Sequence, residues 1–418
     1  MKVMLVNQTD LLGGAARAVN RLHHSLMAAS VNSFMLVNTK LSEDETVRVA
    51  TQGRLLRLIN IVKKYVNKKR WAGFSASDQS YHSTANFSCG MLNALQTMPH
   101  DIVNLHWLGS DTLTIEEIGR ISKPIVWTLH DMWAFCGAEH YVPDDSGARF
   151  RTGYYKGNRP QGEIGPDMNR WVWERKHKAW EKPMTIVCPS RWLAECARES
   201  LLFSGYPIHC IPNPLDVQRW RPLSKAHSRE LFGLPGEKQI ILYGAQGGEA
   251  DFRKGSDLLR TALNILHNNG VRNIQLVIYG QSAPKVQNEL PFPVTYLGRL
   301  QDDVSMIAAY SAADVMIVPS RQDNLPQTAI EAHACGIPVV AFNIGGLSDI
   351  IEHRETGYLA LPFEIVDLAD GIAWVLADEQ RRRVLGAAAR ESAVRKYSEP
   401  VIARAYSELF EQVLSSAI

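Results

Sequence analysis

The 418-residue sequence lacks paired cysteines and long hydrophobic runs. Its six cysteines show no C-x-x-C spacing, and no secretory signal precedes the first apolar segment, which favours reduced thiols in the cytoplasm. No apolar run reaches the roughly 18 residues that a membrane-spanning helix requires. We therefore expect a cytoplasmic protein that is soluble or at most peripheral at the inner face of the cell membrane.

The low net charge and the absence of two sequence motifs argue against further classes of protein. The net charge is only +2 with the 13 histidines neutral, which argues against a nucleic-acid-binding protein. There is no D-x-D triplet for a divalent ion, and no G-x-G-x-x-G fingerprint of a dinucleotide-dependent dehydrogenase. What remains is a globular chain, 45% hydrophobic, that is long enough for two or three domains of roughly 150 residues each.

The most informative segment is DVMIVPSRQDNLPQTAIEAHACGIPVV, from Asp314 to Val340. Its apolar start predicts a buried parallel strand, and a helix should begin at Pro326 and stop at Gly336. A helix N-terminus at the carboxyl end of a parallel strand favours an anion. Asp323 and Glu331 flank this turn, where their carboxylates suit the hydroxyl groups of a sugar or ribose.

Two other strand-to-helix turns have features of a ligand site. Gly13 and Gly14 follow the first predicted strand, and they either let a ligand approach the backbone or serve the turn alone. A strand over Gln239–Tyr243 leads to Arg253 and Lys254. These two cations suit a diphosphate, and a solvated basic loop is the alternative.

Histidines follow two more predicted strands, Asp101–Trp107 and Pro124–Leu129. The second strand runs into His130 and Asp131, and His106 lies near the end of the first. Open α/β sheets place their chemistry at the carboxyl ends of strands, so these side chains are candidates. For His106, function and packing are equally weighted.

Two segments are ambiguous. Residues 54–70, RLLRLINIVKKYVNKKR, carry seven basic side chains and an apolar helical stripe, which fits either an anionic membrane surface or an ordinary surface helix. The stretch from His140 to Pro166 is rich in Gly, Pro, Asp and Arg and indicates a mobile loop. Trp171, Trp173 and Trp180 follow on a helix and either pack or stack on an acceptor sugar.

The segments DNLP, HDMW and RKG together resemble the retaining GT-B glycosyltransferases of family four. The resemblance implies an α/β fold of two doubly wound Rossmann-like domains that face an interdomain cleft. Residues 1–214 would bind the acceptor and residues 215–397 the nucleotide sugar, since the Pro-Asn-Pro of CIPNPLD marks a linker. A terminal helix over 398–418 would cross back to the first domain.

The resemblance also implies residue roles. In the family the first acid and adjoining backbone hold the donor sugar, the second acid holds the ribose, and a basic pair clamps the diphosphate. The clamp arginine is replaced here by Ala245, so Arg253 would have to substitute for it. The predicted catalytic residues are His130, Lys254 and Asp323. The other predicted donor-binding residues are Gly14, Arg253, Asn324, Leu325 and Glu331, and the acceptor-side residues are Gly13, His106 and Asp131.

The activity implied is transfer of a hexose from a UDP- or GDP-linked donor to a saccharide, with retention and without a metal or other cofactor. HDMW and DNLP resemble enzymes of bacterial capsule, exopolysaccharide and O-antigen assembly, so the acceptor would be a lipid-linked saccharide. Two alternatives stay open. One is a nucleotide-sugar epimerase of the same fold, and the other is a non-catalytic scaffold that binds a sugar nucleotide.

Overall fold

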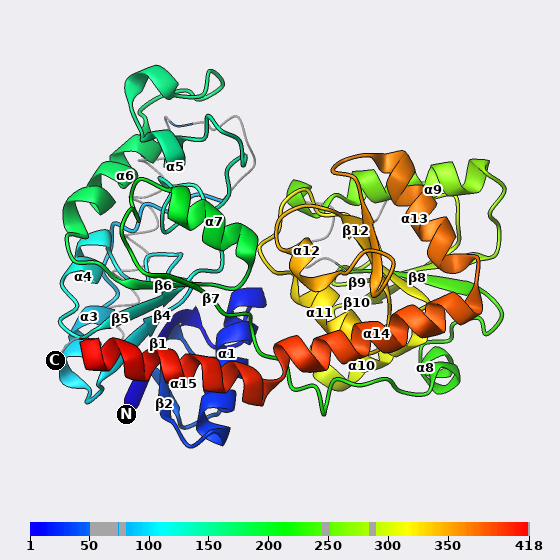
Figure 1. Cartoon of the computed structure of the whole chain (residues 1–418), viewed down its shortest axis with the longest axis horizontal. Coiled ribbons are helices and arrows are strands. Elements are labelled where there is room, and N and C mark those ends of the chain that lie inside the picture. Colours follow the sequence, from blue (N-terminus) through cyan, green and yellow to red (C-terminus); the bar gives the residue numbers. More distant parts are fainter. Residues whose placement is uncertain (51–73, 75–80, 245–250, 284–289, 417–418) are drawn as a thin grey trace. The chain divides into compact units, whose positions relative to one another are not determined.

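The computed structural model describes residues 1–50, 74, 81–244, 251–283 and 290–416. Two compact units make up the chain: Met1–Pro214 with Ile402–Ile418, and Leu215–Val401 (Figure 1). Each unit contains one parallel sheet with helices on both faces. This confirms the predicted α/β class with two doubly wound domains. The predicted basic helix over 54–70 lies outside the described residues.

The sheet of the first unit has seven parallel strands in the order β3-β2-β1-β4-β5-β6-β7. Short apolar runs bounded by polar or glycine residues form the strands. The central strands β1, β4, β5 and β6 are mostly buried because helices cover both faces, whereas β3 and β7 at the edges are more exposed. The strands are β1 (Lys2–Thr9), β2 (Asn32–Thr39), β3 (Val47–Val49), β4 (Ile102–Leu105), β5 (Ile125–Thr128), β6 (Thr185–Cys188) and β7 (Ile208–Cys210).

Two helices far apart in sequence share one face of this sheet. Val19 and Leu22 of α1 and Tyr406 and Phe410 of α15 belong to one apolar cluster with β1 and β2, and the last helix lies along this unit in Figure 1. The other face is covered from the segment between β3 and β7. The helices are α1 (Gly14–Ala28), α3 (Met91–Thr97), α4 (Ile115–Gly119), α5 (Arg149–Thr152), α6 (Met168–Ala179), α7 (Arg191–Glu199) and α15 (Glu399–Ser416).

The second unit repeats the design with six parallel strands in the order β10-β9-β8-β11-β12-β13. Four of them, β8, β9, β11 and β12, are apolar runs of the fully buried kind. The strands are β8 (Gln239–Gly244), β9 (Ile274–Tyr279), β10 (Val294–Gly298), β11 (Val315–Val318), β12 (Val339–Phe342) and β13 (Gly357–Ala360).

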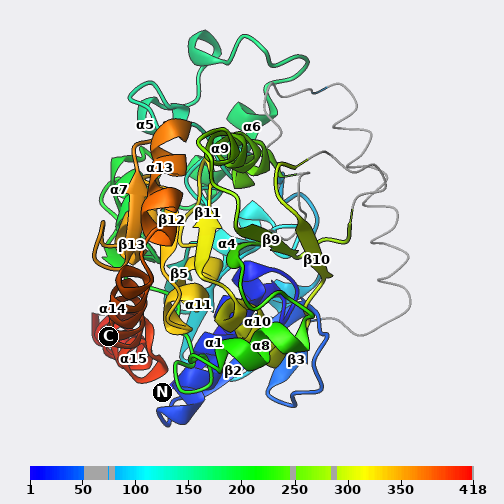
Figure 2. The ribbon, with the colours of Figure 1, turned by 90° about the vertical axis from the view of Figure 1, so that its right-hand side faces the viewer.

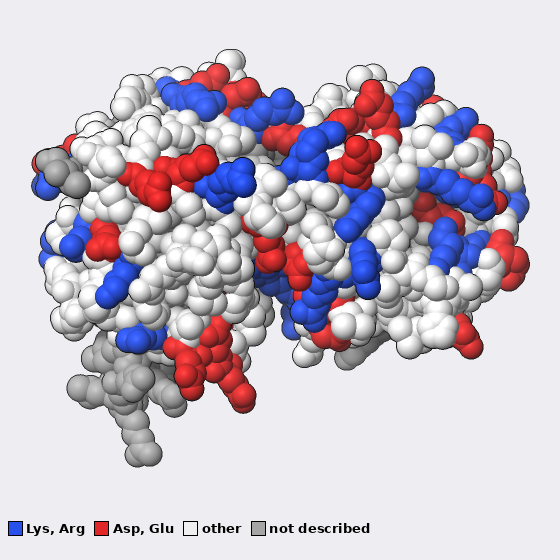
Figure 3. Space-filling view, turned by 60° about the horizontal axis from the view of Figure 1, so that its bottom comes forward, with Lys and Arg blue, Asp and Glu red and all other residues white. Residues whose placement is uncertain are grey.

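Helices α9 and α13 pack on one face of this second sheet, and α10 and α11 on the other, as Figure 2 shows around β11 and β12. On the side of the molecule drawn in Figure 3, acidic and basic side chains are interspersed. The helices are α8 (Lys225–Leu231), α9 (Ser256–Asn268), α10 (Asp303–Ala312), α11 (Gln327–Ala334), α12 (Leu347–Ile350), α13 (Ile365–Leu376) and α14 (Glu379–Tyr397).

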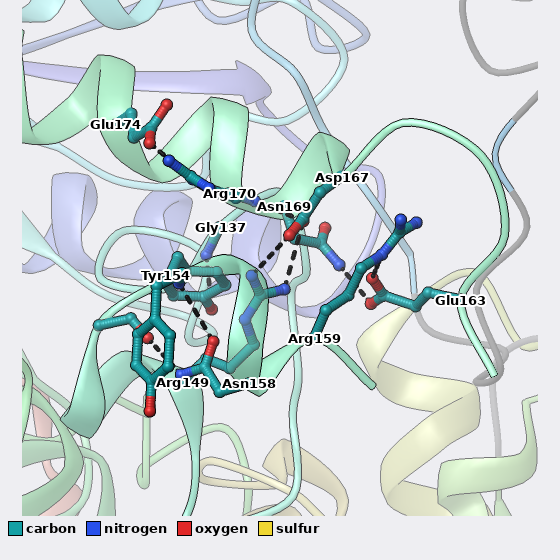
Figure 4. Close-up of polar contacts among 12 residues, drawn as sticks. Gly137, Arg149, Tyr154, Asn158, Arg159, Glu163, Asp167, Asn169, Arg170 and Glu174 are labelled. Atoms are coloured by element: carbon teal, nitrogen blue, oxygen red, sulfur yellow. Dashed lines mark hydrogen bonds and ion pairs between the residues drawn. The ribbon is translucent and has the colours of Figure 1, made fainter. Parts of the chain in front are cut away.

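The segment predicted to be a mobile loop, His140 to Pro166, is a loop for most of its length, and ion pairs and hydrogen bonds connect parts of it to one another and to α6 (Figure 4). It contains α5 and a 3₁₀ turn, Lys156–Asn158. The guanidinium of Arg149 donates to both carboxylate oxygens of Asp167 at 3.3 and 2.8 Å. The Glu163 carboxylate accepts from Asn169 at 2.8 Å and from Arg159 at 3.2 Å. These charged and polar contacts hold parts of the segment together, although its sequence has no apolar period.

None of the six cysteines forms a disulfide in the structure. None of the helices in the described ranges is both long and apolar enough to cross a bilayer. Of the three tryptophans for which packing and stacking were both open, Trp180 is buried against Trp127, whereas Trp171 and Trp173 are half-buried.

Replacing Phe410 with Ala should destabilise the first unit, because this ring is fully buried on α15. A cavity of that kind costs about 3–5 kcal/mol. Denaturant unfolding followed by tryptophan fluorescence would measure the loss. Glu408→Ala is the matched control, because Glu408 is exposed on the same helix and its loss should change stability by less than about 0.5 kcal/mol. Equal stability of the two variants would show that α15 does not contribute to this core.

Candidate active site

The candidate donor residues meet where β8 and β11 end. These strands pair in parallel, with Val315 opposite Ile241 and Ile317 opposite Tyr243, so their carboxyl ends lie together. Lys254 follows β8 and Asp323 follows β11. The Lys254 ammonium donates to Oδ2 of Asp323 at 2.6 Å. Two predicted catalytic residues therefore form one ion pair in the second unit.

Glycines hold these two loops in place. Gly255 has a φ of +65°, and a Cβ there would lie 2.0 Å from the carbonyl oxygen of Pro319. Gly345 has a φ of +52°, and its Cβ would lie 2.2 Å from the carbonyl oxygen of Asp323. Any side chain at either position would push the loops apart. The R-K-G and Gly345-Gly346 turns thus fix the backbone on both sides of the ion pair.

Arg253 is turned to a neighbour in its own loop. Its guanidinium donates to Oδ2 of Asp251 at 2.7 Å, and its carbonyl accepts from the Arg321 amide at 2.7 Å. Its role as the substitute clamp arginine stays a prediction, and Ala245 lies outside the described residues.

Glu331 lies inside α11 and is only 3% exposed. Its Oε2 accepts from the hydroxyl of Tyr310 at 3.1 Å, and that hydroxyl also lies 2.6 Å from the hydroxyl of Tyr279. Burial raises the pKa of Tyr310 well above its usual value, so this phenol remains protonated. Sequence reasoning missed the tyrosine pair, because nothing in a helix or strand pattern distinguishes a phenol that meets a carboxylate.

Asn324 and Leu325 are buried in the turn that leads into α11. Pro326 is the residue before the helix rather than part of its first turn, and α11 runs from Gln327 to Ala334. The hydroxyl of Ser320 donates to Oδ2 of Asp323 at 3.3 Å. Apart from the position of Pro326, the predicted strand, loop and helix are confirmed here.

The predicted residues of the first unit also share one end of a sheet. Gly13 and Gly14 follow β1, which pairs with β4, and β4 pairs with β5. Gly13 has a φ of +96°, and a Cβ at either glycine would meet no atom within 4 Å. The start of α1 is therefore bordered by open space, as a backbone contact with a ligand requires.

A buried chain of hydrogen bonds ends at His130. The amide nitrogen of Asn104 donates to the Val126 carbonyl and to the Thr128 hydroxyl, each at 3.0 Å. The amide oxygen of Asn104 lies 2.9 Å from Nε2 of His106. Nδ1 of His106 lies 3.0 Å from Nε2 of His130. Beyond Thr128, the chain continues to the hydroxyl of Tyr406 on α15 at 3.1 Å.

These contacts fix the protons of both imidazoles. The Asn104 oxygen can only accept, so Nε2 of His106 donates to it, and Nδ1 of a neutral His106 accepts. Nε2 of His130 must then be the donor, which leaves the lone pair of a neutral His130 on Nδ1. Desolvation lowers the pKa of His106 well below its usual value and that of His130 to about 4. Both rings are therefore neutral at pH 7.

Asp131 braces the surroundings of His130. Its carboxylate accepts from Nε1 of Trp107 at 2.8 Å, from Nδ1 of His140 at 2.6 Å and from the Trp133 amide at 3.0 Å. The ring of His140 lies 4.8 Å from that of Tyr81. The acceptor-side role predicted for Asp131 stays a prediction, and its contacts in the structure are with the aromatic side chains next to His130.

Sequence profiles of two glycosyltransferase families match this chain. Residues 225–392 match "Glycosyl transferases group 1", and residues 12–219 match "Glycosyltransferase Family 4". The chain belongs to these glycosyltransferases. The first match contains Lys254, Asp323 and Glu331, and the second contains Gly13 and His130.

Curated relatives are similar over part of their length. A D-inositol 3-phosphate glycosyltransferase of Saccharomonospora viridis is 31% identical over 202 residues, which are 45% of this chain and 46% of that protein. One of Catenulispora acidiphila is 27% identical over 330 residues, 73% of this chain and 71% of that protein. The chain spans about half the length of the first of these relatives.

Two solved structures are similar to this chain over nearly its whole length. A sucrose-phosphate synthase of Thermosynechococcus elongatus covers 99% of both chains with a TM-score of 0.67 and 19% identity. The Anabaena protein HepE in complex with UDP-glucose covers 99% of this chain and 100% of its own, with a TM-score of 0.64 and 16% identity. At these identities the likeness shows the GT-B fold alone.

Within the described ranges, no three or more His, Cys, Asp or Glu side chains are grouped so that they could hold a metal ion. Asn104, Tyr279 and Tyr310 were not predicted from the sequence. Asn104 sits inside a buried strand, and its hydrogen bonds to residues 22 and 24 positions away have no sequence signature.

Replacing Asn104 with Leu should allow both tautomers of His106 and His130, because the amide oxygen that accepts from Nε2 of His106 is removed. ¹⁵N NMR of histidine-labelled protein would show His130 as the Nε2–H tautomer in the wild type and as a mixture in the variant. Thr97→Val is the control, since this exposed threonine bonds only to its own helix. An unchanged tautomer in Asn104→Leu would contradict the chain of hydrogen bonds.

Acidification should destabilise the protein between pH 6.5 and about 4. An unfolded histidine binds a proton near pH 6.5, whereas His130 in the folded protein does so only near 4, so the unfolded state gains protons first and stability falls as pH falls. Allowing for partial exposure, His130 contributes about 2 kcal/mol to this loss. Unfolding free energies at pH 7 and 4.5 should differ less in His130→Gln than in the wild type. The same difference in both proteins would show that His130 does not resist protonation.

Proposed function

We propose that this chain transfers a hexose from a nucleotide-diphosphate sugar to a hydroxyl acceptor, with retention of configuration and without a metal ion or other cofactor. The observation that carries the proposal is the ion pair of Lys254 and Asp323, 2.6 Å apart at the carboxyl ends of β8 and β11. It lies in the segment that matches the group 1 glycosyltransferases. In open α/β sheets this is the end where ligands bind.

Lys254 has the chemistry to assist departure of the diphosphate. Its side chain is 28% exposed and its ammonium is held by Asp323, so Lys254 is accessible to a ligand and fixed in position. Charge on the leaving phosphate grows during bond cleavage, and a fixed cation next to it lowers the barrier. The backbone N–H groups at the start of α11 add partial positive charge. Asp323 then accepts a hydrogen bond from a sugar hydroxyl.

Glu331 has the chemistry to recognise the ribose of the donor. A buried carboxylate that already accepts from Tyr310 suits the hydroxyl groups of a ribose. In the first unit, a neutral His130 has the chemistry to accept a hydrogen bond from a sugar hydroxyl. The acceptor hydroxyl attacks the same face of the sugar that the diphosphate leaves, and the departing phosphate takes its proton, so no side-chain nucleophile is required.

We expect the nucleotide of the donor to be UDP rather than GDP, since HepE was solved with UDP-glucose. For the acceptor we keep the predicted lipid-linked saccharide of bacterial surface polysaccharide synthesis, at the inner face of the membrane. The relatives favour a second candidate, a small polar acceptor, because they carry names such as D-inositol 3-phosphate glycosyltransferase and N-acetyl-alpha-D-glucosaminyl L-malate synthase.

Replacing Glu331 with Ala should weaken nucleotide binding by roughly tenfold to a hundredfold, the cost of a charged hydrogen bond. Replacing Lys254 with Ala should lower turnover by about 10²–10³ while acceptor KM changes far less. Calorimetry with UDP and GDP, and release of nucleotide from their sugars in the presence of each acceptor class, would measure both. Glu355→Ala, an exposed carboxylate in the same unit, is the control.

Three outcomes would count against the proposal. Conversion of a nucleotide sugar without any acceptor would indicate an epimerase. Nucleotide binding without turnover on any acceptor would indicate a scaffold. An Lys254→Ala protein whose turnover and acceptor KM change to the same extent would contradict the role of this ammonium.

A further inference from the structure

A cavity of about 640 Å³ lies in the second unit at the amino end of the sheet. Gln239, the first residue of β8, and Asp314, directly before β11, line it, as does Pro338 before β12. Lys254 and Asp323 follow the carboxyl ends of β8 and β11. The cavity is therefore separated from the candidate donor site by the length of the strands.

The lining of this amino-end cavity is strongly basic. Six Lys or Arg side chains face three Asp or Glu, which leaves three positive charges in excess. Its volume falls within the range of about 300–1,000 Å³ that is usual for small-molecule sites. The basic residues are Lys225, Arg229, Lys238, Arg382, Arg383 and Arg390.

Asp314 is the only one of the three lining carboxylates that is buried, and it is shared by several cations. Its Oδ1 accepts from the ammonium of Lys225 at 2.7 Å, and its Oδ2 from the guanidinium of Arg229 at 2.7 Å. Nε of Arg382 lies 3.7 Å from the same carboxylate. One negative charge therefore serves three positive ones, and further anionic charge would be stabilised here.

Two other cations have no carboxylate partner in the described part of the chain. Arg390 donates only to the backbone carbonyls of Val217, Trp220 and Ala334. Lys238 is half-buried, and among the described residues it makes neither a hydrogen bond nor an ion pair. A cation that is partly desolvated and left without a counter-ion is costly unless an anion binds next to it.

We propose that the amino-end cavity is a second ligand site, which binds a small molecule that carries a phosphate or diphosphate group. Guanidinium groups present paired N–H donors that match phosphate oxygens, and Lys238 adds a point charge. The site does not depend on the activity proposed above, because it uses none of the donor-site residues.

Inorganic pyrophosphate is the probe, and Lys254→Ala is the starting protein, so that the donor site is weakened. Calorimetry at low ionic strength should detect pyrophosphate binding to this full-length variant. Adding Lys238→Ala and Arg383→Ala should weaken that binding at least tenfold. Adding Arg219→Ala should change it less than twofold, because this exposed arginine of the same unit pairs with Asp303 outside the cavity.

Thermal unfolding provides the second measurement. Pyrophosphate should raise the melting temperature of Lys254→Ala more than sulfate at equal ionic strength, because a ligand bound only by the folded state stabilises it. No pyrophosphate binding to Lys254→Ala, equal affinity after removal of Lys238 and Arg383, or an equal effect of sulfate would each overturn the proposal. Loss of UDP and GDP binding in the wild type would count against the glycosyltransferase activity alone.

Discussion

The parallel pairing of β8 with β11 is the constraint on which the candidate donor site depends. It brings together two loops that are 69 residues apart, so that an ammonium and a carboxylate meet at 2.6 Å. Positions 255 and 345 require glycine, because a Cβ there would collide with a carbonyl oxygen of a neighbouring loop. A fixed ion pair costs less to organise during a reaction than one assembled from solvated side chains. The register of the sheet, rather than either loop alone, therefore determines where this ion pair forms.

In the first unit, hydrogen bonds between uncharged side chains, rather than an ion pair, fix the candidate residues in place. The imidazoles of His106 and His130 lie within hydrogen-bonding distance of each other and remain uncharged, and Asn104 determines which nitrogen of each carries the proton. A neutral imidazole of fixed tautomer offers a directional acceptor and adds no positive charge to its surroundings. Such an arrangement suits recognition of a sugar hydroxyl better than general acid catalysis at neutral pH.

Most of the fold could be predicted from sequence, because buried parallel strands are continuous apolar runs with glycine or proline at their ends. The predicted strands Asp101–Trp107, Pro124–Leu129 and Gln239–Tyr243 correspond to β4, β5 and β8. Less regular elements were not predicted. Helix α14 is nineteen residues of mixed charge with little apolar period, and β2 has polar residues at both ends of a short apolar run.

The candidate site divides in the same way. Asp323, Glu331, Lys254 and His130 were found because they follow strand ends, where the sequence pattern is strongest. Asn104 and Tyr310 were not, because their importance comes from contacts across the fold. The segment from His140 to Pro166 shows the same limit, since specific pairs such as Arg149 with Asp167 connect it to neighbouring residues. Pair geometry of this kind leaves no period in the sequence.

The position of α15 has a consequence for synthesis of the chain. The first unit includes Ile402–Ile418, so it is not one continuous stretch, whereas Leu215–Val401 is. During translation, the sheet surface under Tyr406 and Phe410 stays uncovered until α15 has been synthesised, which happens after the whole of Leu215–Val401. The later-made unit can complete its fold first, which reverses the usual order in which domains mature from the amino terminus.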